Sequence, residues 1–267
     1  MRVIASLTDV VNFKSVLVAA LAVLSTWVSL RFGITADFPL TLVATAIVFP
    51  LVFSISTAYA RREKALEEYA RLKALGRALY LASRDWLPGR KEDRDRQLQA
   101  TLYELFSASR DMFTRPLSEM GHYEGRIYAA FDRLSLFVRD MREASLSSTE
   151  CSRLNQYVAQ MATAFESIRN IYEYRTPRTL RAFSEFFILL LSVLYGPYFA
   201  YQAIEFSPDL FFVMPALFAL ILVGLSNIQD HLENPFDQIG QDDLVIDPDH
   251  FVKSLSGNAM AAGTAGR

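Results

Sequence analysis

The chain has 267 residues, of which 52% are hydrophobic and 21% charged, and its net charge is −2. A mean hydropathy of +0.18 is too apolar for a disordered chain and unusual for a soluble domain of this size. The charge is unevenly divided, because residues 61–182 hold 22 of the 27 Lys and Arg against 17 acids, whereas residues 230–267 hold seven acids and two basic residues. The acids nearly balance the basic region, so nothing indicates a nucleic-acid-binding protein.

Four apolar runs match the length of a membrane-spanning helix, for which about 20 residues are needed. Three reach that length, at Phe38–Ala60, Phe186–Ile204 and Leu210–Gln229. A shorter run near the N-terminus, Ser15–Leu30, has 16 uncharged residues between Lys14 and Arg31. These two long side chains can reach the interfaces and extend the span by a turn. The alternative, a signal peptide, is disfavoured by the length of the run and by the lack of a small-residue cleavage site after it.

The basic residues beside the spans indicate the orientation. The connection between the second and third spans begins with Arg61, Arg62 and Lys64 and ends with Arg175, Arg178 and Arg181. The connections at 31–37 and 205–209 carry one Arg and none. Cytoplasmic loops carry the excess of Lys and Arg, so the long connection and both termini are expected in the cytosol.

The second span is expected to continue into the cytosol without a break. Residues 65–86 are rich in strong helix formers with apolar residues at helical spacing. A single helix from about Leu40 to Trp86 has 47 residues and would be roughly 70 Å long. Pro88 and Gly89 end it. Such a helix is typical of an element that transmits or lines something rather than of a plain anchor.

The rest of the cytosolic region is also expected to be helical. Leu98–Phe113 and Ile127–Met141 are amphipathic pieces separated by Pro116 and Gly121. Ser147–Glu150 has the spacing of a capping box and begins a helix that runs to about residue 174.

The predicted fold is an all-α, four-span membrane protein whose long helices extend into a cytosolic helical domain. Its predicted regions are residues 1–60 with the first two spans, 61–182 with the cytosolic helices, 183–229 with the last two spans, and 230–267 with an acidic segment and a small-residue tail.

Pro50 lies inside the second span, where it removes one backbone hydrogen bond and leaves the carbonyl of Ala46 free. In lipid, such a carbonyl must be satisfied or must face a cavity. Proline at this depth therefore slightly favours a helix beside a pore.

One side of the second span carries a line of aromatic and hydroxyl residues. Thr45, Phe49 and Phe53 are spaced by four, and Ser56 and Thr57 continue the line at the cytosolic end. Such a line could form a hydrophobic constriction in a pore, where ring edges tolerate a dehydrated anion. The alternative is a face that contacts lipid or a neighbouring helix.

Three segments resemble the bestrophins, and the bacterial and plant-type branch more than the animal branch. FPLTLVATAIVFPLVFSISTAYARREKALEEY (38–69) is similar to that family's second membrane helix, in which an apolar neck runs into a small polar stretch, a Tyr and a basic helix. RTPRTLRAF (175–183) resembles the start of its third helix, and HLENPFDQIGQDDLVID (231–247) its Asn-Pro-Phe and acidic segment. The resemblance covers residues 10–250.

The resemblance implies a pentameric, mostly anion-selective ion channel, although some bacterial members pass cations. Matching on Tyr59 places the pore neck at Thr45, Phe49 and Phe53. The expected partners are the lipid bilayer, chloride or other small anions, and further copies of the chain. Transport is expected to be passive and no enzyme is expected, because the spans contain almost none of the ionisable residues that mark pumps and membrane enzymes.

The chain departs from the family in its acidic segment and elsewhere. The animal branch's Arg-Phe-Pro tripeptide is absent, and the first neck position is Thr. The animal acidic loop holds Ca²⁺, and the matching candidates here are Asn234, Asp237, Asp242 and Asp243. They are few for a cation that takes six to eight oxygens. The alternative is an acidic segment that contacts the basic region, and no other cofactor is expected.

A second function stays open, namely a non-conducting membrane scaffold whose helical domain binds a partner. The two functions differ in the consequence of replacing Phe49 and Phe53 with Ala. A channel would change its ion flux, whereas a scaffold has no flux to change.

Overall fold

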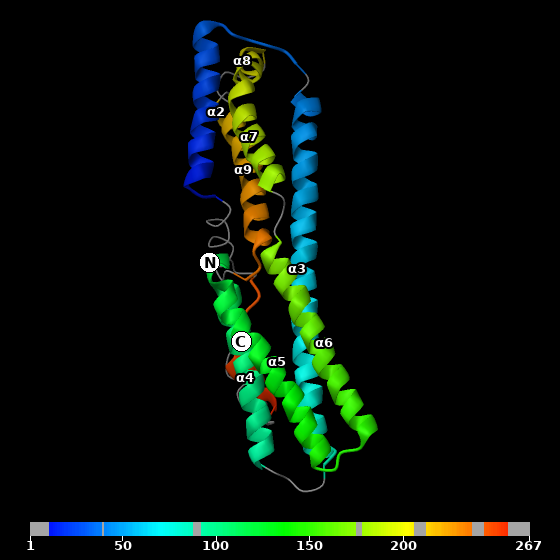
Figure 1. Ribbon diagram of the computed structural model, residues 1–267. Coiled ribbons are helices and arrows are strands. Elements are labelled where there is room, and N and C mark those ends of the chain that lie inside the picture. The colour runs from blue at the N-terminus through cyan, green and yellow to red at the C-terminus, as the bar shows by residue number, and fades with distance from the viewer. Residues whose placement is uncertain are drawn as a thin grey trace. The chain divides into compact units, whose positions relative to one another are not determined.

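The structure is a computed structural model that describes residues 11–38, 40–87, 92–174, 178–205, 212–236 and 243–255. All regular elements within these ranges are helices (Figure 1). They are α2 (Phe13–Phe32), α3 (Leu40–Asp85), α4 (Glu92–Thr114), the 3-10 turn η1 (Leu117–Glu119), α5 (Met120–Glu143), α6 (Ser148–Glu173), α7 (Arg178–Leu194), α8 (Gly196–Glu205), α9 (Val213–Glu233) and α10 (Pro248–Leu255). The predicted all-α class is confirmed.

The chain divides into two compact units. Unit 1 contains Met1–Arg62 and Arg175–Asn234, and unit 2 contains Glu63–Tyr174 and Pro235–Arg267. The 46-residue helix α3 supplies its first part to unit 1 and its remainder to unit 2. Its bounds agree to one residue with the long helix expected from the sequence.

Four helical stretches are long and apolar enough to cross a membrane, as predicted. They are Phe13–Phe32, Ala44–Asp85, Arg181–Glu205 and Val213–Glu233. In unit 1, α2 contacts α7, α8 and α9, and α7 contacts α9. Their shared core includes Leu51, Leu191, Tyr195 and Leu222, each at most 1% exposed. Large apolar side chains such as Trp27 are exposed on the outside, as suits helices surrounded by lipid.

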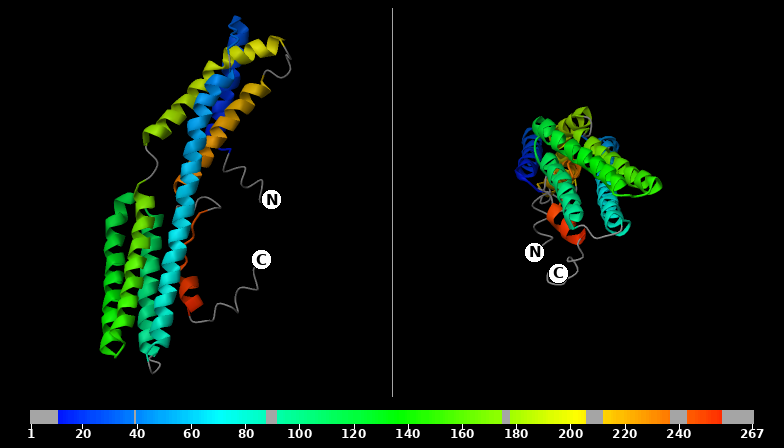
Figure 2. Two further views of the ribbon diagram at one scale, coloured as in Figure 1. Left: turned by 90° about the vertical axis from the view of Figure 1, so that its right-hand side faces the viewer. Right: turned by 60° about the horizontal axis from the view of Figure 1, so that its bottom comes forward.

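The third span is two helices rather than one. The chain changes direction after α7, at Tyr195, before α8 begins (Figure 2). Pro197 has no N–H and cannot bond to the carbonyl of Val193, four residues earlier. That carbonyl instead accepts a hydrogen bond from the Ser25 hydroxyl of α2, at 2.7 Å. This bond replaces the one that Pro197 removes.

Charged side chains join three membrane helices at one end. Arg181 of α7 contacts Asp230 and Glu233 of α9 at 3.0 and 3.3 Å. Glu185 lies 3.6 Å from Arg181 and 3.3 Å from Lys14 of α2. These pairs hold the N-terminal ends of α2 and α7 against the C-terminal end of α9.

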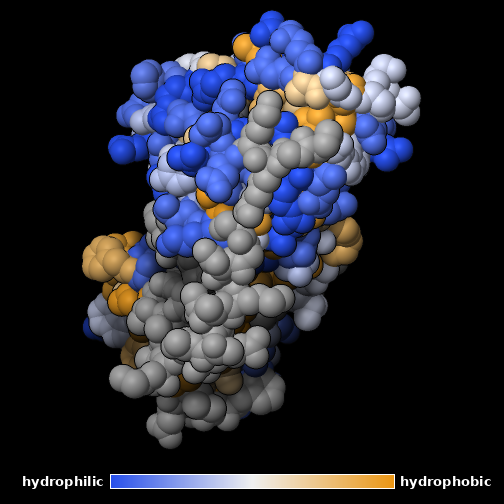
Figure 3. All heavy atoms as spheres, turned by 90° about the horizontal axis from the view of Figure 1, so that it is seen from below, coloured by the Kyte–Doolittle hydropathy of each residue, from blue (hydrophilic) through white to orange (hydrophobic). Residues whose placement is uncertain are grey.

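Unit 2 is a bundle in which α5 contacts α4 and α6, and α10 contacts α4. Aromatic rings occupy its core, with Phe113 stacked on Phe236 at 4.9 Å and Phe106 against Phe251 at 4.4 Å. Figure 3 shows the molecule from below the view of Figure 1, and the described residues on that face are mostly hydrophilic. Unit 2 therefore has the buried core and polar exterior of a helical bundle in water.

The helix ends of unit 2 follow the local sequence, with one exception. Ser147 caps α6, its Oγ accepting from the Glu150 N–H at 3.3 Å, as the capping-box spacing predicted. Pro116 lies just after α4. The exception is Gly121, which lies at the second position of α5 rather than before it, although α4 and α5 are divided where the sequence predicted.

Gly196→Ala tests the junction between α2 and α8. A Cβ at this position would lie 2.8 Å from the Ser25 carbonyl carbon and 2.9 Å from its oxygen, so α2 must move away. We expect a loss of about 1–3 kcal/mol, seen as a lower thermal unfolding midpoint in detergent. The control is Gly125→Ala in α5, where a Cβ meets nothing within 4 Å and the gain is about 1 kcal/mol. Equal midpoints for both variants would contradict the close contact.

Candidate functional site

The first part of α3 has two distinct sides. Each residue of a helix is rotated by about 100° from the last. Ile47, Leu51, Ser54 and Ala58 share one side and are at most 5% exposed. The opposite side carries the five residues singled out from the sequence, which are all exposed and which we call the outer strip: Thr45, Phe49, Phe53, Ser56 and Thr57. The structure thus brings them together on one face, and their role in a pore stays a prediction.

Two phenylalanines dominate the outer strip. Phe49 and Phe53 are 61% and 57% exposed. Their ring centroids lie 4.5 Å apart and their planes meet at 80°, an edge-to-face pair. The rings support each other along the helix axis, so they form one continuous apolar surface.

The hydroxyl groups of the outer strip differ in their hydrogen bonds. Thr45 donates to the carbonyl of Thr41 at 2.6 Å, and Thr57 donates to the carbonyl of Phe53 at 2.9 Å. Among the described residues, the Ser56 hydroxyl has no partner. Two of the three hydroxyls therefore turn their protons toward their own helix.

Pro50 lies within α3, between the two phenylalanines of the outer strip. It removes the N–H that would bond to the carbonyl of Ala46, and Ala46 is exposed. A free carbonyl at this depth needs another donor or a water-filled space beside it. This requirement agrees with a strip that faces something other than lipid.

The Asn-Pro-Phe segment has a packing role in the structure. Phe236 is 1% exposed and stacks in the core of unit 2, and the N–H of Leu244 donates to the carbonyl of Pro235 at 2.7 Å. This bond joins the two ends of the acidic segment to each other, and Phe236 and Leu244 both pack in the core of unit 2. Sequence reasoning considered Ca²⁺ or contact with the basic region for this segment and missed this anchor, although a large apolar residue after Asn-Pro was a signal for burial.

The candidate Ca²⁺ ligands are only partly within the described residues. Asp237 and Asp242 lie outside them, and Asp243 is half-buried. Asn234 ends α9, and its buried Oδ1 has no hydrogen-bond partner in the described part of the chain. One orphan oxygen suits a cation ligand, but six to eight are needed. In the ranges that the structure describes, no three His, Cys, Asp or Glu side chains are grouped as metal ligands.

Ionisable side chains cluster between α5 and α6. Tyr128 donates to Glu166 at 2.7 Å, and Arg169 contacts Glu124 at 3.0 Å and Glu166 at 3.2 Å. Burial and the hydrogen bond with Glu166 raise the pKa of Tyr128 to about 12. The hydroxyl therefore keeps its proton near neutral pH and acts as a hydrogen-bond donor that ties the two helices together.

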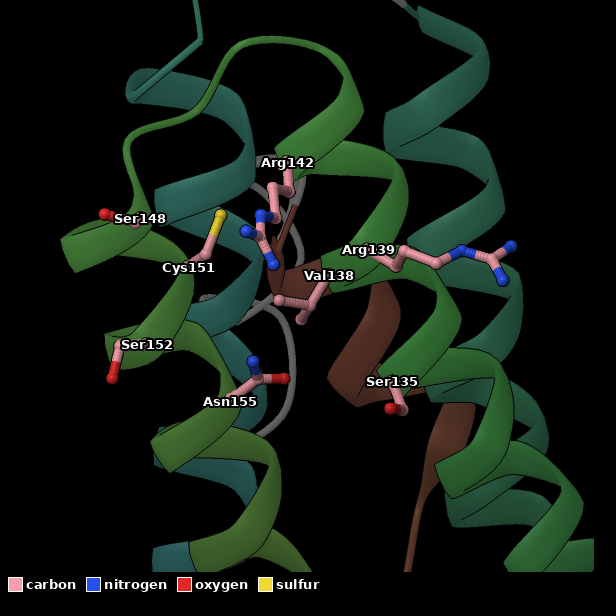
Figure 4. Close-up of a pocket in the computed structure, with 8 residues that line it drawn as sticks. All are labelled: Ser135, Val138, Arg139, Arg142, Ser148, Cys151, Ser152 and Asn155. Atoms are coloured by element: carbon pink, nitrogen blue, oxygen red, sulfur yellow. The ribbon is translucent and has the colours of Figure 1, made fainter.

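A groove of about 410 Å³ lies between the facing ends of α5 and α6. In it the Cys151 thiol and the Arg142 guanidinium point toward each other, and the Arg139 guanidinium points away from α6 (Figure 4). The eight residues that line the groove include no carboxylate and no imidazole that could activate a nucleophile. The groove therefore does not have the arrangement of a catalytic site.

Comparison with solved structures identifies the fold. No protein-family model and no curated protein matches the sequence. A solved membrane protein variant matches with a TM-score of 0.76 at 16% identity, covering 95% of this chain and 100% of that one. A variant of a bacterial bestrophin homolog from Klebsiella pneumoniae matches with a TM-score of 0.75 at 17% identity, covering 93% and 98%. Another structure of that homolog has a TM-score of 0.71 at 16% identity and covers 98% of both chains.

At these identities the similarity shows the fold alone. The chain has the bestrophin-like fold over nearly its whole length, in agreement with the resemblance found in its sequence.

Replacing one residue on each side of α3 tests the division into a buried side and an outer strip. Leu51→Ala removes a side chain that is 0% exposed, and we expect a loss of about 2–5 kcal/mol. Phe49→Ala should lower the thermal unfolding midpoint far less, because its ring is 61% exposed. A larger loss for Phe49→Ala than for Leu51→Ala would show that the outer strip is a buried packing face.

Proposed function

We propose that this protein is a passive ion channel that conducts chloride or another small anion. Several copies of the chain surround an axis, and the outer strip of α3 lines the narrowest part of the path. The observation that carries the proposal is the exposed Phe49 and Phe53 pair on a helix whose opposite side is fully buried. Five copies are proposed on the resemblance alone.

A ring of phenylalanines forms a neck that resists water. Hydrophobic constrictions control conduction by dewetting, so an ion must shed part of its hydration shell to pass. The perpendicular planes of Phe49 and Phe53 allow ring edges to face the path, and ring edges carry partial positive charge. This chemistry supports passage of a weakly hydrated anion better than passage of a small, strongly hydrated cation.

The composition of the neck supports passive flow. Residues 41–60 contain no Asp, Glu, Lys, Arg or His. Pumps and ion-coupled carriers use ionisable groups within the membrane to couple two fluxes. A neck with none offers a path without a coupling step, and no catalytic step is proposed.

We propose that both termini face the cytosol. The basic residues Lys14 and Arg181 lie at one shared end of α2, α7 and α9, and Arg61 and Arg62 follow the second span. Cytoplasmic ends of spans carry such residues. The proposal requires no cofactor, and measuring flux with Ca²⁺ and with a Ca²⁺ chelator tests the acidic segment separately.

The first test is ion flux through liposomes that contain the purified protein. We expect chloride flux from the wild-type protein and several-fold faster flux from Phe49→Ala with Phe53→Ala, because smaller side chains widen and wet the neck. The matched control is Phe186→Ala on α7, whose ring is 60% exposed and lies outside the strip, and it should leave the flux unchanged.

Absence of any halide or potassium flux, from protein shown to be folded and oligomeric, would overturn the channel. The scaffold function would then take its place, and the bestrophin-like fold would carry no statement about conduction.

A further inference from the structure

We propose that Ser56 supplies the hydrogen bond that selects anions, at the cytosolic end of the neck. The inference rests on the proposed function and adds a specificity-determining residue to it. It follows from the hydrogen bonds and helical positions of the hydroxyl groups on α3.

Besides the ring edges, a neck without charged side chains can recognise an anion through hydrogen-bond donors. With no basic side chain in residues 41–60, the hydroxyl groups of that stretch are the polar groups that side chains can offer there. A hydroxyl that gives its proton to a backbone carbonyl presents only lone pairs outward, and lone pairs repel an anion. A hydroxyl can therefore bind chloride only if its proton is not already donated to a backbone carbonyl.

The two threonines of the outer strip have already used their protons. Thr45 and Thr57 donate to the carbonyls one turn earlier, at 2.6 and 2.9 Å. The Ser56 hydroxyl is exposed and makes no such bond to any described residue. Of the three, Ser56 alone holds a proton that it can donate away from the helix.

The position of Ser56 also suits the role. It lies seven residues after Phe49, which is about 20° short of two full turns of the helix, so it lies on the same side as the phenyl rings. Thr57 lies about 80° around from Phe49, toward the edge of the strip. Measured from Phe53, the last ring of the neck, Ser56 lies about 60° and Thr57 about 40° around the helix. An anion that leaves the neck therefore meets both hydroxyls, and of the two only Ser56 has kept its proton for donation.

Tyr59 is the competing donor. Its ring is 53% exposed, and it lies about 80° around from Phe49 on the other side of the strip. A long side chain at the edge contacts a neighbouring surface more readily than the centre of the path. Tyr59→Phe removes this hydroxyl alone and so distinguishes its contribution from that of Ser56.

Ser56→Ala removes the donor and keeps the helix. We expect the chloride-to-potassium permeability ratio, measured from reversal potentials in reconstituted bilayers, to fall about tenfold, in line with the loss of one hydrogen bond to a charged group. The matched control is Ser54→Ala, the same change two residues earlier, on the buried side, where the hydroxyl is 2% exposed and unpartnered. Ser54→Ala should keep the wild-type ratio, and thermal unfolding midpoints confirm that both variants fold.

The outcomes separate this inference from the channel itself. An unchanged ratio in Ser56→Ala, with wild-type conduction intact, overturns the role of Ser56 and leaves the channel standing. If the permeability ratio falls in Tyr59→Phe but not in Ser56→Ala, the donor is Tyr59, and the role of Ser56 is again overturned. A wild-type protein that conducts no ion overturns both the channel and the inference.

Discussion

A backbone carbonyl that loses its helical partner inside a membrane must find another donor, and unit 1 is arranged around this constraint. Pro197 removes the bond to Val193, and the Ser25 hydroxyl of the neighbouring helix replaces it. Gly196 allows the close approach that this bond requires, since a Cβ there would strike the Ser25 backbone. A hydroxyl group in an apolar environment also needs a partner, and Thr45 and Thr57 donate to carbonyls of their own helix. The outer strip is left with few free donors.

The packing of α3 leaves the outer strip exposed. Leu51 and Ala58 are almost fully buried on one side of the helix, so the helix cannot rotate without exposing them. Phe49 and Phe53 are then held outward by the same contacts that bury Leu51. Hydrophobic burial on one side of α3 thus presents an exposed aromatic surface on the other.

The helices could be predicted from the sequence because the signals that specify them are local. Apolar runs and helix formers predicted α3 to within a residue, and periodicity placed the outer strip on one side of it. The division between α4 and α5 was predicted too, with Gly121 in the first turn of α5 rather than before it. The break at Tyr195 was missed although Gly196-Pro197 is a local signal for it, and the Ser25 bond that compensates for it spans 168 residues of chain. Asp237 and Asp242 lie outside the described residues, so the Ca²⁺ assignment stays a prediction.

The sequence by itself determined the class of the protein, the four spans and the side of α3 that carries the phenylalanines. These depend on hydropathy and on the fixed rotation of a helix, which act over a few residues. Only the tertiary structure decided which side of α3 is buried, how the third span breaks, and that Arg181 joins α7 to α9. Such contacts form between residues far apart in the chain, and the choice among many similar apolar faces depends on packing that no local pattern encodes.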